Sequence, residues 1–346
     1  MSWRSIAVGI ALAASSPALA AQQPVPAKPL FADSDVLRIT LRGPVSAIVR
    51  SRSTQPRPAS LELSGAGETY PIRLSARGIT RRQADICQFP PLRVEFTSSP
   101  PAGSLFAGQR RLKLVTHCRT APAFQKHVLL EHAAYRMFNL LTPASFRVRL
   151  AMIDYVEAEG RPIASRYGFF IEDIDDVARR NGAREAKVGD TVPASYLRLA
   201  EVARYVLFQH MLGNHDWSMH AGPKGAGCCH NSKLIGPQQA ARATLTPVPY
   251  DFDFSGFVDA PYATPPDALR IATVRQRRYR GSCAHNRYAE AAAGEFRAAR
   301  AKLLAELHGT PGLEDAAKRR AADYLERFFA DIATDSDVAK LLKACE

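Results

Sequence analysis

The run Tyr250-Asp251-Phe252-Asp253 places two carboxylates, one residue apart, inside an apolar and strand-like stretch of the chain. Successive side chains of a strand point to opposite faces. Asp251 and Asp253 are therefore predicted to lie on one face of the strand and Phe252 on the other. Two like charges in apolar surroundings are costly unless a cation or hydrogen-bond donors neutralise them. Any fold of this chain must therefore bring a compensating group to this run, and we predict a divalent cation.

The N-terminal residues have the pattern of an export signal. Arg4 supplies a positive charge, residues 6–14 form a short apolar stretch, and Ala18-Leu19-Ala20 has the small residues of a cleavage site. We therefore predict a signal peptide over residues 1–20, a proline-rich leader over 21–35, and a periplasmic or secreted protein. The apolar stretch is too short to cross a bilayer, and no later segment is long enough, so no membrane span is predicted.

The charge balance limits the choice of partner. The 346-residue chain has a formal net charge of +13, which favours an acidic substrate or partner. Its basic residues are scattered, however, without a dense tract interleaved with aromatic residues, so no nucleic acid is predicted as a partner. The densest basic run, residues 274–281, is either a grip for an acidic group or a solvated loop; we call it the basic segment.

Six cysteines in an exported chain favour disulfides over reduced thiols, and the lack of a CxxC pair argues against zinc. Cys87 and Cys118 lie in the first half of the chain and form a plausible pair. The adjacent Cys228 and Cys229 are expected to bond to different partners. Cys283 could then tie the basic segment to this cysteine pair.

Hydrophobic periodicity divides the chain near residue 172. Residues 36–172 are predicted to form a β-rich lobe with one prominent helix over 124–141, and residues 173–346 a mostly helical lobe. The predicted strands of the first lobe span residues 36–42, 61–63, 70–74, 92–96, 112–115, 147–156 and 166–171. The second lobe is predicted to contain helices over 196–212, 288–307 and 313–333, and a hairpin between 231 and 248.

Two more polar residues accompany the paired carboxylates in the second half. Asp216 lies in a polar loop after the helix that ends near Leu212, where catalytic side chains are commonly presented. Asn231 begins the hairpin that leads to Asp251. Together they offer one base and several oxygen ligands for a hard cation. Phosphoryl transfer with bound Mg²⁺ needs this combination.

These motifs resemble the spore-coat protein H (CotH) family of secreted atypical kinases. The resemblance covers residues 61–256 and is carried by Arg77-Gly78, Leu130-Glu131-His132, residues 167–172, Asn214-His215-Asp216, His230-Asn231 and Tyr250-Asp251-Phe252-Asp253. It implies an α+β, two-lobed, protein-kinase-like architecture, with a β-rich N-lobe containing one main helix and a mostly α C-lobe. It also implies an enzyme that uses ATP with Mg²⁺ or Mn²⁺ to phosphorylate a protein or another hydroxyl substrate.

The resemblance assigns a role to each polar residue of the second half. Asp216 would be the catalytic base. Asp251 would be the main metal ligand, in the place of the first residue of the kinase Asp-Phe-Gly motif, with Asn231 and Asp253 as further ligands.

The resemblance also implies a phosphate-binding cation that pairs with Glu131 on the helix of the first lobe. The chain offers two candidates, Arg93 on one predicted strand and Lys113 on the next. Arg and Lys are not interchangeable at such a site, because a guanidinium binds phosphate in a bidentate manner and an ammonium does not. The choice between them is open, and so is the alternative of an inactive, pseudokinase-like interaction protein of the cell envelope.

A third function follows from the histidines that surround the same motifs. His210, His215, His220 and His230 could join the carboxylates in a metal-dependent hydrolase that activates water. Their spacing does not place them on one face of a helix, so this hypothesis ranks below phosphoryl transfer.

Overall fold

The structure is a computed structural model that describes residues 25–345. The predicted signal peptide and residues 21–24 of the predicted leader therefore lie outside the described residues. The rest of the leader contains a short 3-10 turn, η1 (Pro29–Phe31), whose Leu30 and Phe31 side chains are buried. Between residues 25 and 345, no helix combines the length and the apolar character needed to cross a membrane.

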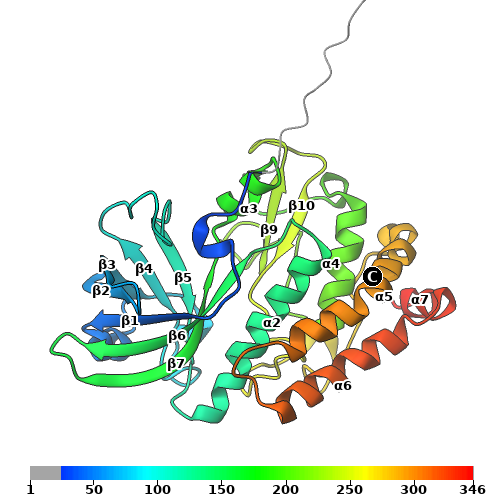
Figure 1. Cartoon of the computed structure of the whole chain (residues 1–346). Helices are drawn as coiled ribbons and strands as arrows, with labels where there is room; N and C mark the ends of the chain where they lie inside the picture. Colours follow the sequence, from blue (N-terminus) through cyan, green and yellow to red (C-terminus); the bar gives the residue numbers. More distant parts are fainter. Residues whose placement is uncertain (1–24, 346) are drawn as a thin grey trace, which may run out of the picture.

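Seven strands of the first half close into a barrel, which lies on the left of Figure 1. The strands are β1 (Leu37–Gly43), β2 (Arg57–Leu63), β3 (Glu68–Ala76), β4 (Leu92–Phe96), β5 (Arg111–Val115), β6 (Val148–Glu157) and β7 (Pro162–Ile171). Their order around the barrel is β1-β2-β3-β4-β5-β7-β6. Each of the strands predicted for this half overlaps one of them.

The predicted two-lobed, protein-kinase-like architecture is wrong. Strand β1 pairs antiparallel with β2 and parallel with β6, and the second pairing runs from Leu37 opposite Ala151 to Gly43 opposite Glu157. This second ladder closes the sheet, so the first half is a barrel rather than an open β-rich lobe, and the whole is a mixed α/β fold. Alternation of apolar residues identifies each strand, but it does not specify which strand edges pair.

The interior of the barrel is apolar, and this fixes what its outer face carries. Leu74 of β3, Val94 of β4 and Leu112 of β5 are fully buried within it. Because side chains alternate along a strand, the neighbours of these residues in the sequence point outward. The outer face of β3–β5 is therefore available to form one wall of a site.

Most helices pack on one side of the barrel (Figure 1), whereas the first helix contacts strands β3 and β6 of the barrel itself. They are α1 (Val45–Ser51), α2 (Gln125–Leu141), α3 (Ile174–Arg180), α4 (Leu199–Leu212), α5 (Asn286–His308), α6 (Asp315–Asp331) and α7 (Asp335–Leu342). Helix α2 contacts β7 and α5, while α4 contacts α5 and α6. The predicted long helices α2, α4, α5 and α6 are confirmed. Helices α1, α3 and α7 have only seven or eight residues, too few for a clear period.

A small second sheet carries the predicted hairpin. It consists of β8 (Arg184–Glu185), β9 (Ser232–Gly236) and β10 (Thr246–Pro249), in the order β10-β9-β8. Strand β10 ends before the paired carboxylates, and Asp251 has a left-handed φ of 63°. The predicted strand alternation of Asp251 and Asp253 is therefore wrong, although both side chains still reach one common group.

All six cysteines are paired. The predicted disulfide between Cys87 and Cys118 is confirmed. Cys228 pairs with Cys229, and Cys283 pairs with Cys345, so the expected separate partners and the tie to the basic segment are both wrong. The contact between helices α5 and α7 explains the disulfide of Cys283 with Cys345, because Cys283 precedes α5 and Cys345 follows α7.

Candidate functional site

A cleft lies between the outer face of β3–β5 and helix α3. Its cavity has a volume of about 800 Å³. The walls are charged, with Arg73, Glu95 and Arg111 on the side of the barrel and Asp173 and Arg179 on the side of α3. Charged walls of low dielectric concentrate the field within a cleft, so this cavity suits a charged ligand.

Both candidates for the phosphate-binding cation, Arg93 and Lys113, lie on the same outer face of β3–β5, beside the residues that line the cleft. Ser75, Arg93 and Lys113 are direct cross-strand neighbours on β3, β4 and β5. Arg77 follows β3 and lies within electrostatic range of Arg93 and of Lys113. We call Arg77, Arg93 and Lys113 the basic cluster. Three cations on one face offer several contacts to a polyanionic group such as a triphosphate.

Lys113 is the lysine of this face, and it is largely shielded from solvent. Its ammonium lies over the rings of Phe146 and Tyr250. Burial lowers the pKa of Lys113 to about 8, and the positive charge of Arg77 adds to the effect. An ammonium that has lost much of its water is a favourable partner for an anion that enters the cleft.

Asp216 is held by two side chains in the loop that follows α4. The Nε2 atom of His230 lies 2.6 Å from its Oδ1, and the Nδ2 of Asn231 donates to its Oδ2 at 2.9 Å. The bond to Asp216 raises the pKa of His230. The Asp216 side chain is 33% exposed, so a substrate hydroxyl can reach the carboxylate.

The backbone around Asp216 is fixed at both ends. Helix α4 is terminated by Gly213, whose φ of 58° is left-handed, and a Cβ at this position would lie 2.0 Å from the Tyr324 hydroxyl. Further along, Ser218 and His230 exchange two backbone hydrogen bonds of 2.9 and 3.0 Å. These bonds close the loop that carries Cys228 and Cys229 and place His230 beside Asp216.

Asp251 lies next to this group. The N–H of Tyr250 donates to the backbone oxygen of Asn231 at 3.1 Å, which anchors the start of the run. The charge of Asp251 adds to that of Asp216 in raising the pKa of His230. Burial, then the charges of Asp251 and of Asp216, raise the pKa of Tyr250 to about 12. The structure thus brings Asp216, Asn231 and Asp251 into one neighbourhood.

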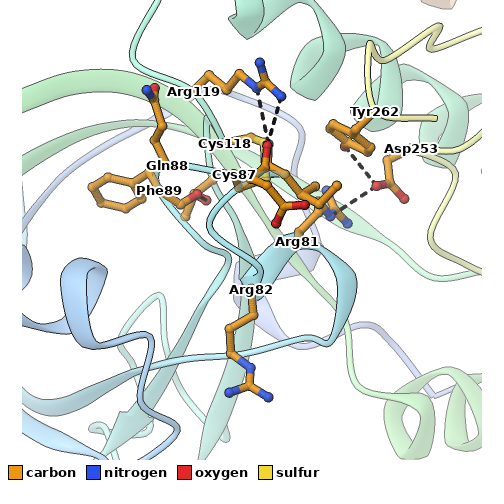
Figure 2. Close-up of a disulfide and its surroundings, with 12 residues drawn as sticks. Arg81, Arg82, Cys87, Gln88, Phe89, Cys118, Arg119, Asp253 and Tyr262 are labelled. Atoms are coloured by element: carbon orange, nitrogen blue, oxygen red, sulfur yellow. Dashed lines mark hydrogen bonds and ion pairs between the residues drawn. A yellow bond between two sulfur atoms is a disulfide. The ribbon is translucent and has the colours of Figure 1, made fainter.

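Glu131, Asp251 and Asp253 converge on Arg81, a residue that the sequence analysis did not single out. The Nη1 of Arg81 lies 2.8 Å from Glu131, its Nη2 2.6 Å from Asp251, and its Nε 3.2 Å from Asp253. Figure 2 shows Arg81 directed toward Asp253, where it and the Tyr262 hydroxyl contact the same carboxylate oxygen. We call the three acidic residues the acidic cluster.

The electrostatics of the acidic cluster reflect a shortage of positive charge. Burial raises the pKa of Glu131 and of Asp253, because one guanidinium does not fully compensate three neighbouring carboxylates. The Tyr262 hydroxyl donates a further hydrogen bond of 2.9 Å to Asp253. Burial alone would lower the pKa of Arg81, but the carboxylates outweigh it and hold that pKa well above its usual range.

The oxygen atoms of the acidic cluster are the candidate ligands of the predicted metal ion. One oxygen or more from each of the three acids lies within 4.8 Å of the others, a spacing that could hold a metal ion. Each acid, however, already gives an oxygen to Arg81. Asn231, the other predicted ligand, donates its Nδ2 to the backbone oxygen and to the Oδ2 of Asp216. The residues as they stand fit a guanidinium and not a divalent ion.

The predicted partner of Glu131 differs from the one in the structure. Glu131 pairs with Arg81, and not with Arg93 or Lys113, which lie on the outer face of the barrel. Arg81 follows Arg77-Gly78, a segment that belongs to the resemblance. Glu131 and Asp253 are buried while the Asp251 side chain is 41% exposed, and the cation that neutralises them lies in a short 3-10 turn rather than on a predicted strand.

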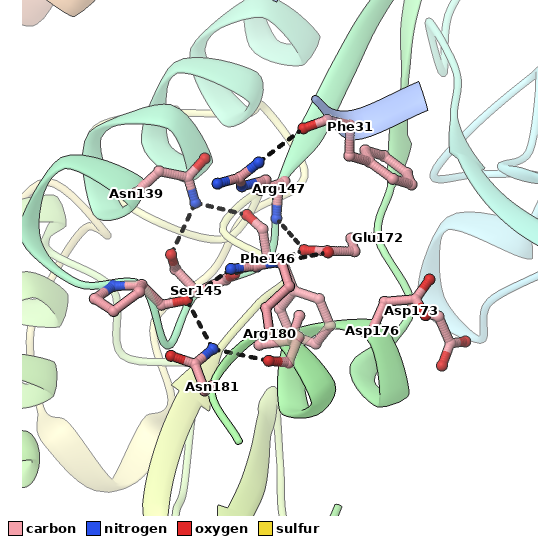
Figure 3. A network of polar contacts seen from close by, with 12 residues as sticks. Phe31, Asn139, Ser145, Phe146, Arg147, Glu172, Asp173, Asp176, Arg180 and Asn181 are labelled. Atoms are coloured by element: carbon pink, nitrogen blue, oxygen red, sulfur yellow. Dashed lines mark hydrogen bonds and ion pairs between the residues drawn. The ribbon is translucent and has the colours of Figure 1, made fainter. Parts of the chain in front are cut away.

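Glu172, the last residue of the strand motif over 167–172, has a structural role. It accepts two hydrogen bonds from Arg180, of 2.9 and 2.8 Å, and one of 3.0 Å from the backbone N–H of Arg147. Arg180 also donates to the backbone oxygen of Ser145 at 2.9 Å. Figure 3 shows this network, which joins the end of β7 to α3 and to the start of β6 beside the cleft.

The histidines of the hydrolase hypothesis do not gather around a metal position. His210 is buried in α4, while His215 and His220 each bond to a backbone oxygen. Over residues 25–345, the acidic cluster is the one group of three or more His, Cys, Asp or Glu side chains whose ligand atoms could share a metal, and it contains no histidine. A zinc site with two histidine ligands is therefore not supported.

The basic segment braces the site from within the protein. Arg277 donates to the backbone oxygen of Tyr324 at 2.6 Å, and its guanidinium lies 3.8 Å from the centroid of the Tyr324 ring. Arg280 donates to the backbone oxygen of His215 at 2.7 Å. Arg280 thus holds the loop that presents Asp216, and Arg277 attaches the basic segment to α6.

No protein-family model and no curated protein matches this chain. The resemblance to the spore-coat protein H family therefore stays a prediction that depends on the quoted motifs, and the function has to be inferred from the geometry of the site.

Proposed function

We propose that this chain is an exported phosphotransferase, similar in its motifs to the spore-coat protein H family, which transfers phosphate from ATP to a hydroxyl group of a protein or small molecule. The observation that carries the proposal is a neighbourhood of opposite charges. An exposed carboxylate, Asp216, is fixed by His230 and Asn231. Asp251, beside it, lies within electrostatic range of Arg77 and Lys113.

The basic cluster would bind the phosphates. Arg77 and Lys113 lie within electrostatic range of Asp251, and Arg93 pairs with Lys113 across the neighbouring strand. Between the candidates Arg93 and Lys113, the burial and the low pKa of Lys113 favour Lys113 as the closer phosphate ligand. Preorganised cations of this kind stabilise the charge on a transferring phosphoryl group.

Asp216 would accept the proton of the acceptor hydroxyl. In the proposed step the hydroxyl oxygen forms a bond to the γ-phosphorus, the bond from that phosphorus to the ADP oxygen breaks, and ADP keeps the electron pair. His230 and Asn231 hold the carboxylate in one orientation and so reduce the cost of positioning it. No carboxylate of the acidic cluster accepts a proton in this step, because Arg81 engages all three of them.

Export is supported by the pattern of residues 1–20 and by three disulfides, since disulfides persist in oxidising compartments. The inactive alternative, an interaction protein of the cell envelope, is favoured by one observation. Arg81 occupies the position at which the resemblance places a metal. An assay of ATP use separates the two functions.

The test measures ATP binding and ATP consumption by the full chain, with Mg²⁺, with Mn²⁺ and with a chelator. We expect Asp216→Asn to abolish turnover while ATP still binds, and Lys113→Met to weaken binding at least tenfold. Asp154→Asn is the matched control, because Asp154 is an exposed carboxylate of β6 outside the site. Binding without turnover in the unmodified protein would favour the inactive alternative. Failure to bind ATP under all three conditions would refute the phosphotransferase and leave an interaction protein that does not use ATP.

A further inference from the structure

Arg81 meets the acidic cluster as a multivalent cation would. Each of its three nitrogens contacts a different carboxylate: Nη1 lies 2.8 Å from Glu131, Nη2 2.6 Å from Asp251 and Nε 3.2 Å from Asp253. The planar fork of a guanidinium can satisfy several acceptors at once, whereas an ammonium acts as a single point charge. The side chains of Arg81, Glu131 and Asp253 are no more than 10% exposed, so solvent contributes little to their neutralisation.

The segment that carries Arg81 is firmly attached. Arg81 lies in the 3-10 turn η2 (Thr80–Arg82), and the same loop is joined by the disulfide of Cys87 to Cys118. The next residue, Arg82, donates to the backbone oxygen of Gly78 at 2.9 Å and receives a hydrogen bond of 3.1 Å from Arg52 at its own oxygen. Displacing the guanidinium would require a rearrangement of this turn or an unpaired, buried positive charge.

We infer that Arg81 is the resident cation of Glu131, Asp251 and Asp253, and that this chain excludes divalent metal ions from these three carboxylates as long as Arg81 is present. An arginine does not lose its proton in the physiological range, so its charge is permanent. A metal would compete with Arg81 for the same three carboxylates, and a displaced guanidinium would be left without these partners. This inference does not depend on the proposed phosphotransfer.

The test measures Mn²⁺ binding by calorimetry and by electron paramagnetic resonance, after the full chain has been freed of metal with a chelator. We expect no stoichiometric Mn²⁺ binding to the acidic cluster of the unmodified protein. Arg81→Gln should bind one Mn²⁺ at least tenfold more tightly, and Arg81→Gln/Asp253→Asn should lose that gain. Arg82→Gln is the matched control, because it removes a neighbouring guanidinium that bonds to backbone oxygens and not to the carboxylates.

Two results would overturn the inference. One is binding of a single Mn²⁺ by the unmodified protein that disappears in Asp253→Asn. The other is a folded Arg81→Gln variant with no gain in Mn²⁺ affinity. If Arg81→Gln does not fold without metal, two outcomes support the inference: folding on addition of Mn²⁺, and folding of the charge-balanced Arg81→Gln/Asp253→Asn variant. If neither restores the fold, electrostatic compensation by Arg81 is refuted. Since ATP is absent throughout, failure here leaves the proposed phosphotransfer untouched.

Discussion

The Nζ atom of Lys113 lies 5.9 Å from the centroid of the Tyr250 ring, and Tyr250 precedes the carboxylate of Asp251. The amine is thus positioned at the edge of the proposed site, where burial and then the charge of Arg77 bring its pKa to about 8. This relationship links the basic cluster on the barrel to the acids of the second half. It makes the protonation of Lys113 one source of pH dependence above neutral pH.

We predict that Lys113, the lysine of the β3–β5 face, reacts faster with amine-selective reagents than Lys233 of β9 does. With a pKa of about 8, roughly a quarter of Lys113 is neutral at pH 7.5, against about 0.1% for an ordinary lysine. Competitive labelling followed by mass spectrometry measures the rate at each lysine. Lys233, which is ion-paired with Glu185, serves as the control, and equal rates at Lys113 and Lys233 would contradict the assignment.

The same lysine predicts how stability and ligand binding depend on pH. Its folded pKa lies below the unfolded value, so between about pH 8 and about pH 10.4 the unfolded chain binds more protons, and the contribution of Lys113 to stability rises with pH. Anion binding should change in the opposite sense, because the cation is lost above about pH 8. Denaturant titrations and ATP titrations from pH 7 to pH 9.5 measure both, and Lys113→Met should flatten each dependence.

His230 should titrate above its ordinary pKa because of Asp216. The bond to Asp216 and the nearby charge of Asp251 both raise the pKa of His230, while burial opposes them. A raised folded pKa means that this contribution to stability is present below the unfolded pKa of about 6.5 and is lost as the pH rises through the folded value. Histidine NMR titration should show a fall of the His230 pKa in Asp216→Asn. An unchanged pKa in that variant would show that the two side chains are not bonded in solution.

The strands and long helices could be predicted from the sequence because each depends on local periodicity. The predicted strand over 92–96 and the helix ending at Leu141 have the observed limits or nearly so. The closure of the barrel could not be predicted, since it depends on the parallel pairing of β1 with β6, which are far apart in the sequence. Neither strand carries a residue that specifies its partner.

Part of the candidate site, namely Asp216, Asn231 and Asp251, could be predicted from the sequence. Asp216, Asn231 and Asp251 lie in loops next to regular elements, so their convergence followed from motif order. The cation that neutralises Asp251 and Asp253 could not be identified from pattern, because Arg81 lies in a short 3-10 turn with no periodic signal. The physical requirement for a compensating charge was correct, but it does not distinguish a metal from an arginine.

We predict that Glu172→Gln destabilises the protein by about 3 kcal/mol, because it leaves Arg180 buried without its counter-charge. Both side chains of this pair are at most 6% exposed, and the carboxylate also receives the Arg147 N–H. Urea unfolding monitored by circular dichroism gives the change. Glu159→Gln is the control, because the pair of Glu159 with Arg161 is more than 60% exposed on both sides and should contribute less than about 0.5 kcal/mol. Equal effects of the two substitutions would contradict the structural role of Glu172.

The three disulfides should differ in their contributions to stability according to the length of chain that each one closes. Cys87 and Cys118 are 31 residues apart, so loop-closure entropy predicts a loss of about 3 to 4 kcal/mol when both are replaced by serine. Cys283 and Cys345, 62 residues apart, should contribute slightly more. Cys228 and Cys229 are adjacent and close no such loop, so their replacement should cost less than about 1 kcal/mol. Unfolding free energies of the three double-serine variants test this order. A large loss for the adjacent pair would mean that it stabilises the loop carrying His230 through native contacts and not through the unfolded state.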